Sequence, residues 1–170
     1  MALATKSRPI LFSGPMVRAI LSGNKTQTRR VVKLNRHYQI EERDDGSLWP
    51  WMYDDDRASD SWLACPYGKP GDRLWVREAW RTERDFDHLP PRDLDPTMTA
   101  TPVQYEAGPH ADVLDGKLRP SMFMPRWASR ITLEVTAVRV ERLQDISEAD
   151  AIAEGGTETM RGWWTHEGLQ

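Results

Sequence analysis

The chain has 170 residues and a net charge of −3, with 39% hydrophobic and 29% charged residues. This length suits one domain, and the composition predicts a soluble globular protein. The sequence contains neither the roughly 20 consecutive apolar residues of a membrane helix nor a secretory signal, so we expect a cytoplasmic protein without a membrane partner.

Metal and disulfide chemistry are not indicated. Cys65 is the single cysteine, which excludes an internal disulfide and fits a reducing compartment. The four histidines lack metal-ligand spacing, and the aspartates at 54–56 lack the spaced ligands of a calcium loop. We therefore expect no metal and no cofactor.

The charge is distributed unevenly along the chain. Residues 1–40 contain eight Lys or Arg and no acid, whereas the remaining 130 residues contain 15 bases against 26 acids. This pattern suits a basic face that attracts a polyanion, and it equally suits a basic segment that pairs with acids inside the fold. The charge pattern alone leaves both interpretations open.

The N-terminal region predicts a strand, a helix and a second strand. Residues 10–12 are apolar and predict a short buried strand. Ser13 and Pro15 are typical of a helix start, apolar residues then recur at helical spacing, and Gly23 is a typical helix stop. A strand is expected over 26–32.

The middle of the chain alternates long polar stretches with short structured ones. Residues 34–66 and 82–124 show little periodicity and are expected to be insertions, which often carry function. Residues 67–72 predict a turn, and residues 74–78 predict a strand.

The clearest strand signal is at 129–143, where the apolar alternation slips by one residue and predicts a β-bulge at 136–137. Ser147 then predicts the N-cap of a short helix that ends before Gly155. We expect an α+β protein built on a small β-barrel with short flanking helices. No convincing strand is visible in 157–170.

Three motifs resemble the ASCH domain, a relative of PUA RNA-binding domains. They are the block Gly23-x-Lys25-Thr26-x-Thr28-x-Arg30, the turn at 70–72, and the helix from Ser147 to Glu154. The wider pattern is similar to ASCH proteins encoded by bacteriophages and prophages, and it covers most of the chain outside the insertions. The resemblance implies a PUA-like barrel in one domain over 1–170. The sequence after Gly156 does not show the apolar strand that commonly closes this barrel, so we expect either that the chain is truncated or that its tail closes the site differently.

The resemblance also implies a chemistry. One bacterial branch of the family hydrolyses the acetyl amide of N4-acetylcytidine with a lysine, a threonine and a glutamate, which align with Lys25, Thr28 and Glu154. A threonine hydroxyl needs a base to take its proton, and a lysine of lowered pKa can act as that base. In a strand the Lys25 and Thr28 side chains would point to opposite faces, unless Lys25 lies in the turn before the strand.

Several cations and aromatic residues are candidates for nucleotide or RNA contacts, because bases stack on exposed rings near positive charge. Trp127 with Arg126 is the favoured pair, although Trp127 equally suits a plug at the barrel end. Trp75 is expected in the core, while Trp49, Trp51 and Trp62 are expected to anchor the first insertion. The full set of candidate contacts is Thr26, Arg29, Arg30, Arg77, Trp80, Arg126 and Trp127, with Tyr105 a further aromatic candidate.

Four functions remain open at this point. The first is an amidohydrolase acting on an acetylated nucleoside, and the second is a non-catalytic RNA-binding module. A ribonuclease ranks lower, because no matched pair of histidines is visible. The fourth is a phage accessory protein that binds a host protein through its Pro- and Trp-rich insertions.

Overall fold

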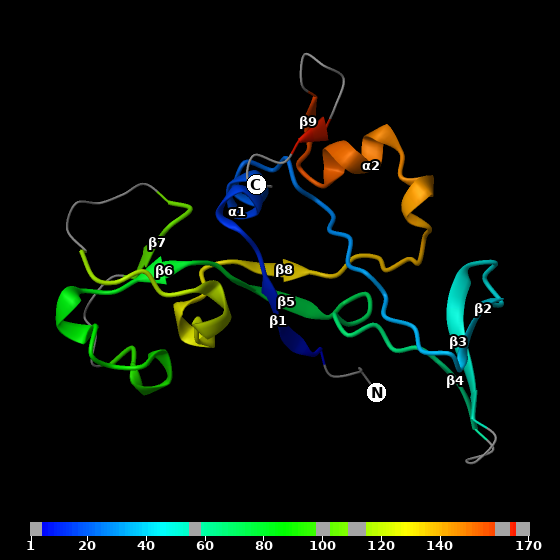
Figure 1. The fold of residues 1–170 in the computed structure, drawn as a ribbon, viewed down its shortest axis with the longest axis horizontal. Coiled ribbons are helices and arrows are strands. Elements are labelled where there is room, and N and C mark those ends of the chain that lie inside the picture. Colours follow the sequence, from blue (N-terminus) through cyan, green and yellow to red (C-terminus); the bar gives the residue numbers. More distant parts are fainter. Residues whose placement is uncertain (1–4, 55–58, 98–102, 109–114, 159–163, 166–170) are drawn as a thin grey trace.

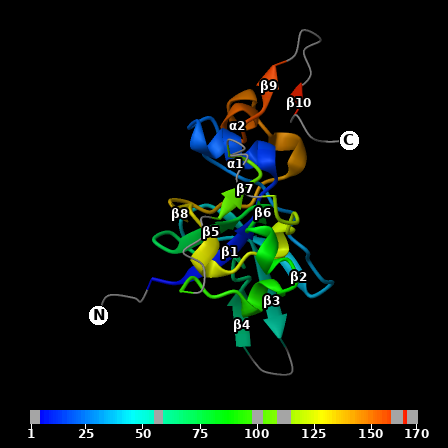
Figure 2. The ribbon, with the colours of Figure 1, turned by 90° about the vertical axis from the view of Figure 1, so that its left-hand side faces the viewer.

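The computed structural model describes residues 5–54, 59–97, 103–108, 115–158 and 164–165. Its centre is a three-stranded sheet in the order β1 (Ser7–Leu11), β5 (Arg73–Arg77), β8 (Thr132–Glu134). β1 runs parallel to β5, and β8 runs antiparallel to β5. Helices α1 (Gly14–Leu21) and α2 (Glu148–Ala153) lie together on one side of this sheet (Figures 1 and 2). The protein is a small α+β fold, as predicted.

Helix α1 has the boundaries that local sequence chemistry predicts. Ser13 is the extended N-cap residue, and the backbone N–H of Val17 donates to its carbonyl. Gly23 follows the helix with φ +77°, a conformation that glycine adopts without steric cost. Val17 is fully buried and packs with Ile10 in the main core, so α1 is fixed against the sheet by its apolar face.

Helix α2 is held at its start by a capping box. The Ser147 hydroxyl accepts from the backbone N–H of Asp150, and the Asp150 carboxylate accepts from the backbone N–H of Ser147. Gly155 follows the helix with φ +84°. Both ends of this six-residue helix are therefore set by residues that the sequence analysis identified.

The predicted strand over 26–32 is wrong. Lys25 forms a single antiparallel bridge with Glu154, and residues 26–35 have no regular structure. The backbone N–H groups of Thr26 and Gln27 both donate to the carbonyl of Ala153, at 2.8 and 3.0 Å. The segment therefore partners the end of α2, whose last carbonyls have no partner within the helix.

The long strand predicted over 129–143 is much shorter in the structure. β8 covers three residues. Backbone hydrogen bonds to β5 and to the turn before it extend this pairing by one residue at each end, to Ile131 and to Val135. The slip in the apolar alternation coincides with the point where pairing ends. The predicted bulge at 136–137 is absent because that stretch lies outside the ladder.

The two stretches expected to be insertions contain regular structure. The first forms an antiparallel sheet of β2 (Tyr38–Glu42), β3 (Leu48–Asp54) and β4 (Ser59–Trp62). The second contains β7 (Gln104–Tyr105), which pairs with β6 (Trp80–Arg81). The part of the chain that the structure describes also has short 3-10 helices at Arg84–Phe86, Pro91–Asp93, Ser121–Phe123, Arg126–Ala128 and Leu143–Asp145. The second stretch also builds a separate core, in which Trp80 packs with Leu94 and Met124.

A closed barrel is not formed by the described residues. Their strands make two sheets of three strands and two sheets of two. In the C-terminal region, where no strand was expected, β9 (Thr157–Glu158) pairs with β10 (Trp164–Thr165) and not with the central sheet. Each of these strands has two residues, which is too short to show the alternation of apolar and polar residues that predicts a strand.

The turn at 67–72 fixes the N-terminal strand through one buried carboxylate. Asp72 is 2% exposed and accepts hydrogen bonds from the backbone N–H groups of Lys6 and Lys69 and from the Arg8 guanidinium. The bond from Lys6 is the main cause that lowers the pKa of Asp72. The Pro-Gly-Asp motif thus has a structural role, because it joins the start of β1 to the start of β5.

Candidate functional site

The loop 23–30 lies against the end of α2 and next to the carboxyl ends of β1 and β5. The bridge between Lys25 and Glu154 joins two residues that are 129 positions apart in the sequence. Phe12, directly after β1, lies beneath both cations of the loop: the Lys25 amine is 5.9 Å and the Arg30 guanidinium carbon 5.5 Å from its ring centroid. The structure therefore brings the predicted lysine and glutamate together.

Lys25 is only 6% exposed, and its amine is held by carbonyl groups. The amine donates to the backbone oxygens of Gln27 and Glu154, both at 2.8 Å. Burial is the main cause that lowers the pKa of Lys25; nearby Arg30 lowers it further, and the charge of Glu154 opposes the shift. An ammonium has three donors, whereas a neutral amine has two and a lone pair. Lys25 can thus lose a proton, keep both bonds and gain a free lone pair, as a general base requires.

Thr28 is held by the neighbouring arginine rather than by the lysine. The Arg30 guanidinium donates to the Thr28 hydroxyl oxygen at 2.9 Å, and it also donates to the carbonyls of Leu11 and Arg29. A cationic donor on this oxygen stabilises its deprotonated form. Within the described residues the Lys25 amine makes no hydrogen bond to Thr28, so a productive pair requires a movement of the loop.

The Glu154 carboxylate is engaged by Arg29. One guanidinium nitrogen of Arg29 donates to Oε1 of Glu154 at 2.7 Å, while the other contacts Glu141 at 3.1 Å and Asp150 at 3.2 Å. These carboxylates raise the pKa of Arg29, and the hydrogen bond that Arg29 donates to Glu154 is the largest cause. Oε2 of Glu154 has no hydrogen-bond partner among the described residues. Glu154 therefore contributes its carbonyl to Lys25 and keeps one carboxylate oxygen open.

This cluster answers part of the question that the charge pattern left open. Arg29, predicted as an RNA contact, is turned toward three acids of the fold, and Arg8 pairs with Asp72. Arg30, by contrast, has no carboxylate partner among the described residues. The positive charges of Arg29 and Arg8 are thus paired with acids of the fold, whereas the charge of Arg30, which lies beside Thr28, is not paired with an acid among the described residues. Thr26 contributes its backbone N–H to α2 and has an exposed side chain.

The structure removes Trp80 from the predicted base contacts. Its side chain is fully buried, so it presents no face on which a base could stack. Trp127 is half-buried and contacts Trp80 edge-on, with ring centroids 6.1 Å apart. Tyr105 is also half-buried, and its hydroxyl donates to the carbonyl of Ala128. These rings belong to the second core and its margin.

Arg77 and Arg126 both lie close to the ring of a core tryptophan. Their guanidinium carbons are 4.6 and 5.7 Å from the ring centroid of Trp75, which is buried as predicted. Arg77 also pairs in register with Leu11, whose carbonyl accepts from Arg30. The backbone of Arg77 is therefore close to the loop 23–30, while its side chain points elsewhere and donates to the carbonyl of Met122.

Sequence reasoning missed Phe12 and Glu78. Phe12 provides the ring beneath Lys25 and Arg30. Glu78 is 1% exposed and forms two hydrogen bonds with Arg130, at 2.8 and 2.9 Å. Each residue directly follows one of the two parallel strands, and the carboxyl ends of such strands are common places for functional residues. That position in the sequence was the available signal.

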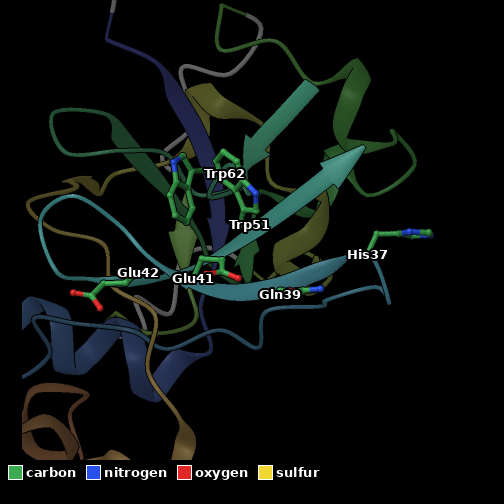
Figure 3. Close-up of a pocket in the computed structure, with 6 residues that line it drawn as sticks. All are labelled: His37, Gln39, Glu41, Glu42, Trp51 and Trp62. Carbon is green, nitrogen blue, oxygen red and sulfur yellow. The ribbon is translucent and has the colours of Figure 1, made fainter. Parts of the chain in front are cut away.

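Two hollows on the described surface lie elsewhere. One of about 380 Å³ is on the β2–β3–β4 sheet (Figure 3), and one of about 320 Å³ lies between residues 88–91 and 117–123. Neither is lined by the lysine, threonine and glutamate of the loop site. Within the described residues, no group of three His, Cys, Asp or Glu is arranged to hold a metal ion, and no helix has the length and apolarity to cross a membrane.

Comparison with known proteins found no matching family model, no matching curated protein and no matching solved structure. The similarity to the ASCH family therefore depends on the motifs of the sequence itself.

Proposed function

We propose that this chain is an ASCH-type amidohydrolase that removes the acetyl group from N4-acetylcytidine or a similar acylated nucleoside. The observation that carries this proposal is the buried amine of Lys25, which contacts Glu154 although the two residues are far apart in sequence. The PUA-like barrel of the family is part of the same proposal and would need strands in addition to those described.

The reaction would proceed in two stages. The Thr28 oxygen attacks the acetyl carbonyl carbon while the Lys25 amine takes the hydroxyl proton. The Arg30 guanidinium, which donates to the Thr28 oxygen, stabilises the negative charge that develops on that oxygen as the proton leaves. The bond between the carbonyl carbon and N4 then breaks, and a proton passes to N4 so that cytidine leaves. Water hydrolyses the acetyl ester on Thr28, which releases acetate and restores the hydroxyl group.

Glu154 has two separable contributions in this scheme. Its backbone carbonyl holds the Lys25 amine in place. In this proposal its carboxylate oxygen Oε2 receives the proton that Lys25 removes from Thr28 and passes it to the leaving nitrogen. A Glu154→Gln substitution removes the second contribution and the ion pair with Arg29, whereas the backbone carbonyl that holds Lys25 is retained. The substitution thus separates proton transfer from positioning.

The test is to incubate the protein with N4-acetylcytidine and follow cytidine by chromatography. Wild type should release cytidine, Lys25→Ala and Thr28→Val should lose turnover, and Thr28→Ser should retain part of it. Lys33→Ala is the matched control, since Lys33 is exposed. No release of cytidine from the free nucleoside or from an acetylated RNA oligonucleotide, or release unaffected by Lys25→Ala, would refute the proposal.

A further inference from the structure

The hollow on the β2–β3–β4 sheet has tryptophan walls. Gln39, Trp51 and Trp62 are aligned across the three strands by the strand register. The two indole rings are 4.5 Å apart at an angle of 65°. Figure 3 shows them standing side by side above Glu41, with Gln39 along the strand beside them, while His37 and Glu42 extend away at the two ends. The centre of the hollow is therefore formed by two rings, one carboxylate and one amide.

A guanidinium already lies on this face. The guanidinium carbon of Arg43 is 3.9 Å from the ring centroid of Trp49 and 5.0 Å from that of Trp62. Trp49 is 6% exposed, and its indole N–H donates to the carbonyl of Leu63, which fixes the ring. The chain's own arginine thus demonstrates that this row of tryptophans accepts a planar cation by cation–π contact.

The charge of the hollow favours a cation as well. Its lining includes Glu41 and Glu42 and no Lys or Arg, although Arg43 lies beside it on Trp62. The ion pairs of the described residues include neither glutamate. Residues 34–66 contain eight Asp or Glu against three Lys or Arg, a balance of −5. Nucleic-acid phosphates would be repelled here, whereas a partner with several positive charges would be attracted beyond the single hollow.

We propose that this hollow binds an arginine or lysine side chain of a basic peptide segment on a partner protein. The cation lies against the rings of Trp51 and Trp62 and is neutralised by Glu41, and the described acids Glu42, Asp44 and Asp45 of the same segment attract the flanking positive charges. This site is separate from the loop site, so it is independent of the proposed amidohydrolase activity.

The test is fluorescence anisotropy of a labelled oligoarginine peptide titrated with the full chain at low salt. Trp62→Leu should weaken binding about 5- to 30-fold, the range expected for loss of a partly desolvated cation–π contact. Glu41→Gln should weaken it about 3-fold or more and flatten its salt dependence. Trp62→Phe should retain most of the affinity because a ring remains, and this variant guards against loss of the fold.

The matched control is Glu134→Gln, an exposed acid on β8, which should change affinity less than about twofold. If Glu41→Gln and Glu134→Gln weakened binding equally, the binding would be non-specific charge attraction, and the proposal would be overturned. Absence of saturable binding would overturn it too. So would a single-stranded RNA that binds more tightly than the peptide and loses affinity with Trp62→Leu, since the face would then be a stacking platform.

Discussion

Replacing Arg29 with alanine tests how the candidate site is assembled. The guanidinium contacts Glu141, Asp150 and Glu154, and these three acids come from two different segments around α2. The Arg29 side chain keeps 25% of its surface in water, and the three acids keep between 19 and 30%. The cluster is thus only partly screened by solvent, and alanine would leave three neighbouring carboxylates without their shared cation.

The size of the expected loss in stability can be worked out from these contacts. An exposed ion pair contributes about 0.5 kcal/mol, and a well-formed hydrogen bond to a charged group about 1.5 to 3 kcal/mol. Arg29 makes two such bonds, at 2.7 and 3.1 Å, in partial contact with water. We expect Arg29→Ala to lower the free energy of unfolding by about 2 to 3 kcal/mol, which for a chain of this size lowers Tm by about 4 to 12 °C.

The assay is denaturant unfolding, followed by circular dichroism, at low and at high salt. Arg36→Ala is the matched control, because Arg36 belongs to the same basic segment, is exposed and has no carboxylate partner among the described residues. It should change stability by less than about 0.5 kcal/mol. An Arg29→Ala protein as stable as wild type that had lost RNA affinity would refute the internal role of Arg29 and restore the polyanion interpretation.

Three further predictions concern the elements around the site. Hydrogen bonds from Ser147 above all, and then from Gln27, lower the pKa of Asp150. The folded chain therefore binds fewer protons at this group than the unfolded chain does. The resulting stability is complete well above the ordinary value of 3.8 and is lost as the pH falls below it, so Asp150→Asn should flatten the acid limb of stability measured against pH. Gly68→Ala should cost about 1 to 3 kcal/mol in thermal unfolding, because Gly68 has φ +110° and a Cβ atom there would lie 2.8 Å from a carboxylate oxygen of Asp72; an unchanged Tm would contradict this. Trp80→Ala should cost about 3 to 5 kcal/mol in denaturant unfolding, since the ring is fully buried in the second core, and a much smaller loss would show that this core collapses around the cavity.

The helices were predictable because their signals are local. Ser13, Gly23 and Ser147 act within a few residues of their own positions, through backbone conformation or a cap, and the structure has α1 and α2 at these boundaries. The alternation of Ile131 with its apolar neighbours likewise identified a strand, although it did not show where pairing would stop.

The predicted strand at 26–32 failed for a physical reason. β-propensity reports how well a side chain suits a pleated surface, and the threonines of this loop satisfy it. The backbone donors of Thr26 and Gln27 are instead taken by the carbonyl of Ala153, which needs a partner at the end of α2. That competition is visible only when the distant helix is in place.

The sequence by itself determined where both helices begin and end, the turn that carries Asp72, and which residue types occur in the motif from Gly23 to Arg30. Only the tertiary structure decided that Lys25 is buried against the carbonyl of Glu154, that Arg29 faces acids rather than solvent, and that Trp80 lies in a core. The physical reason is range: a cap or a glycine turn acts over a few bonds of the chain, whereas desolvation of an amine and pairing of a guanidinium depend on which remote groups the fold brings within hydrogen-bonding distance.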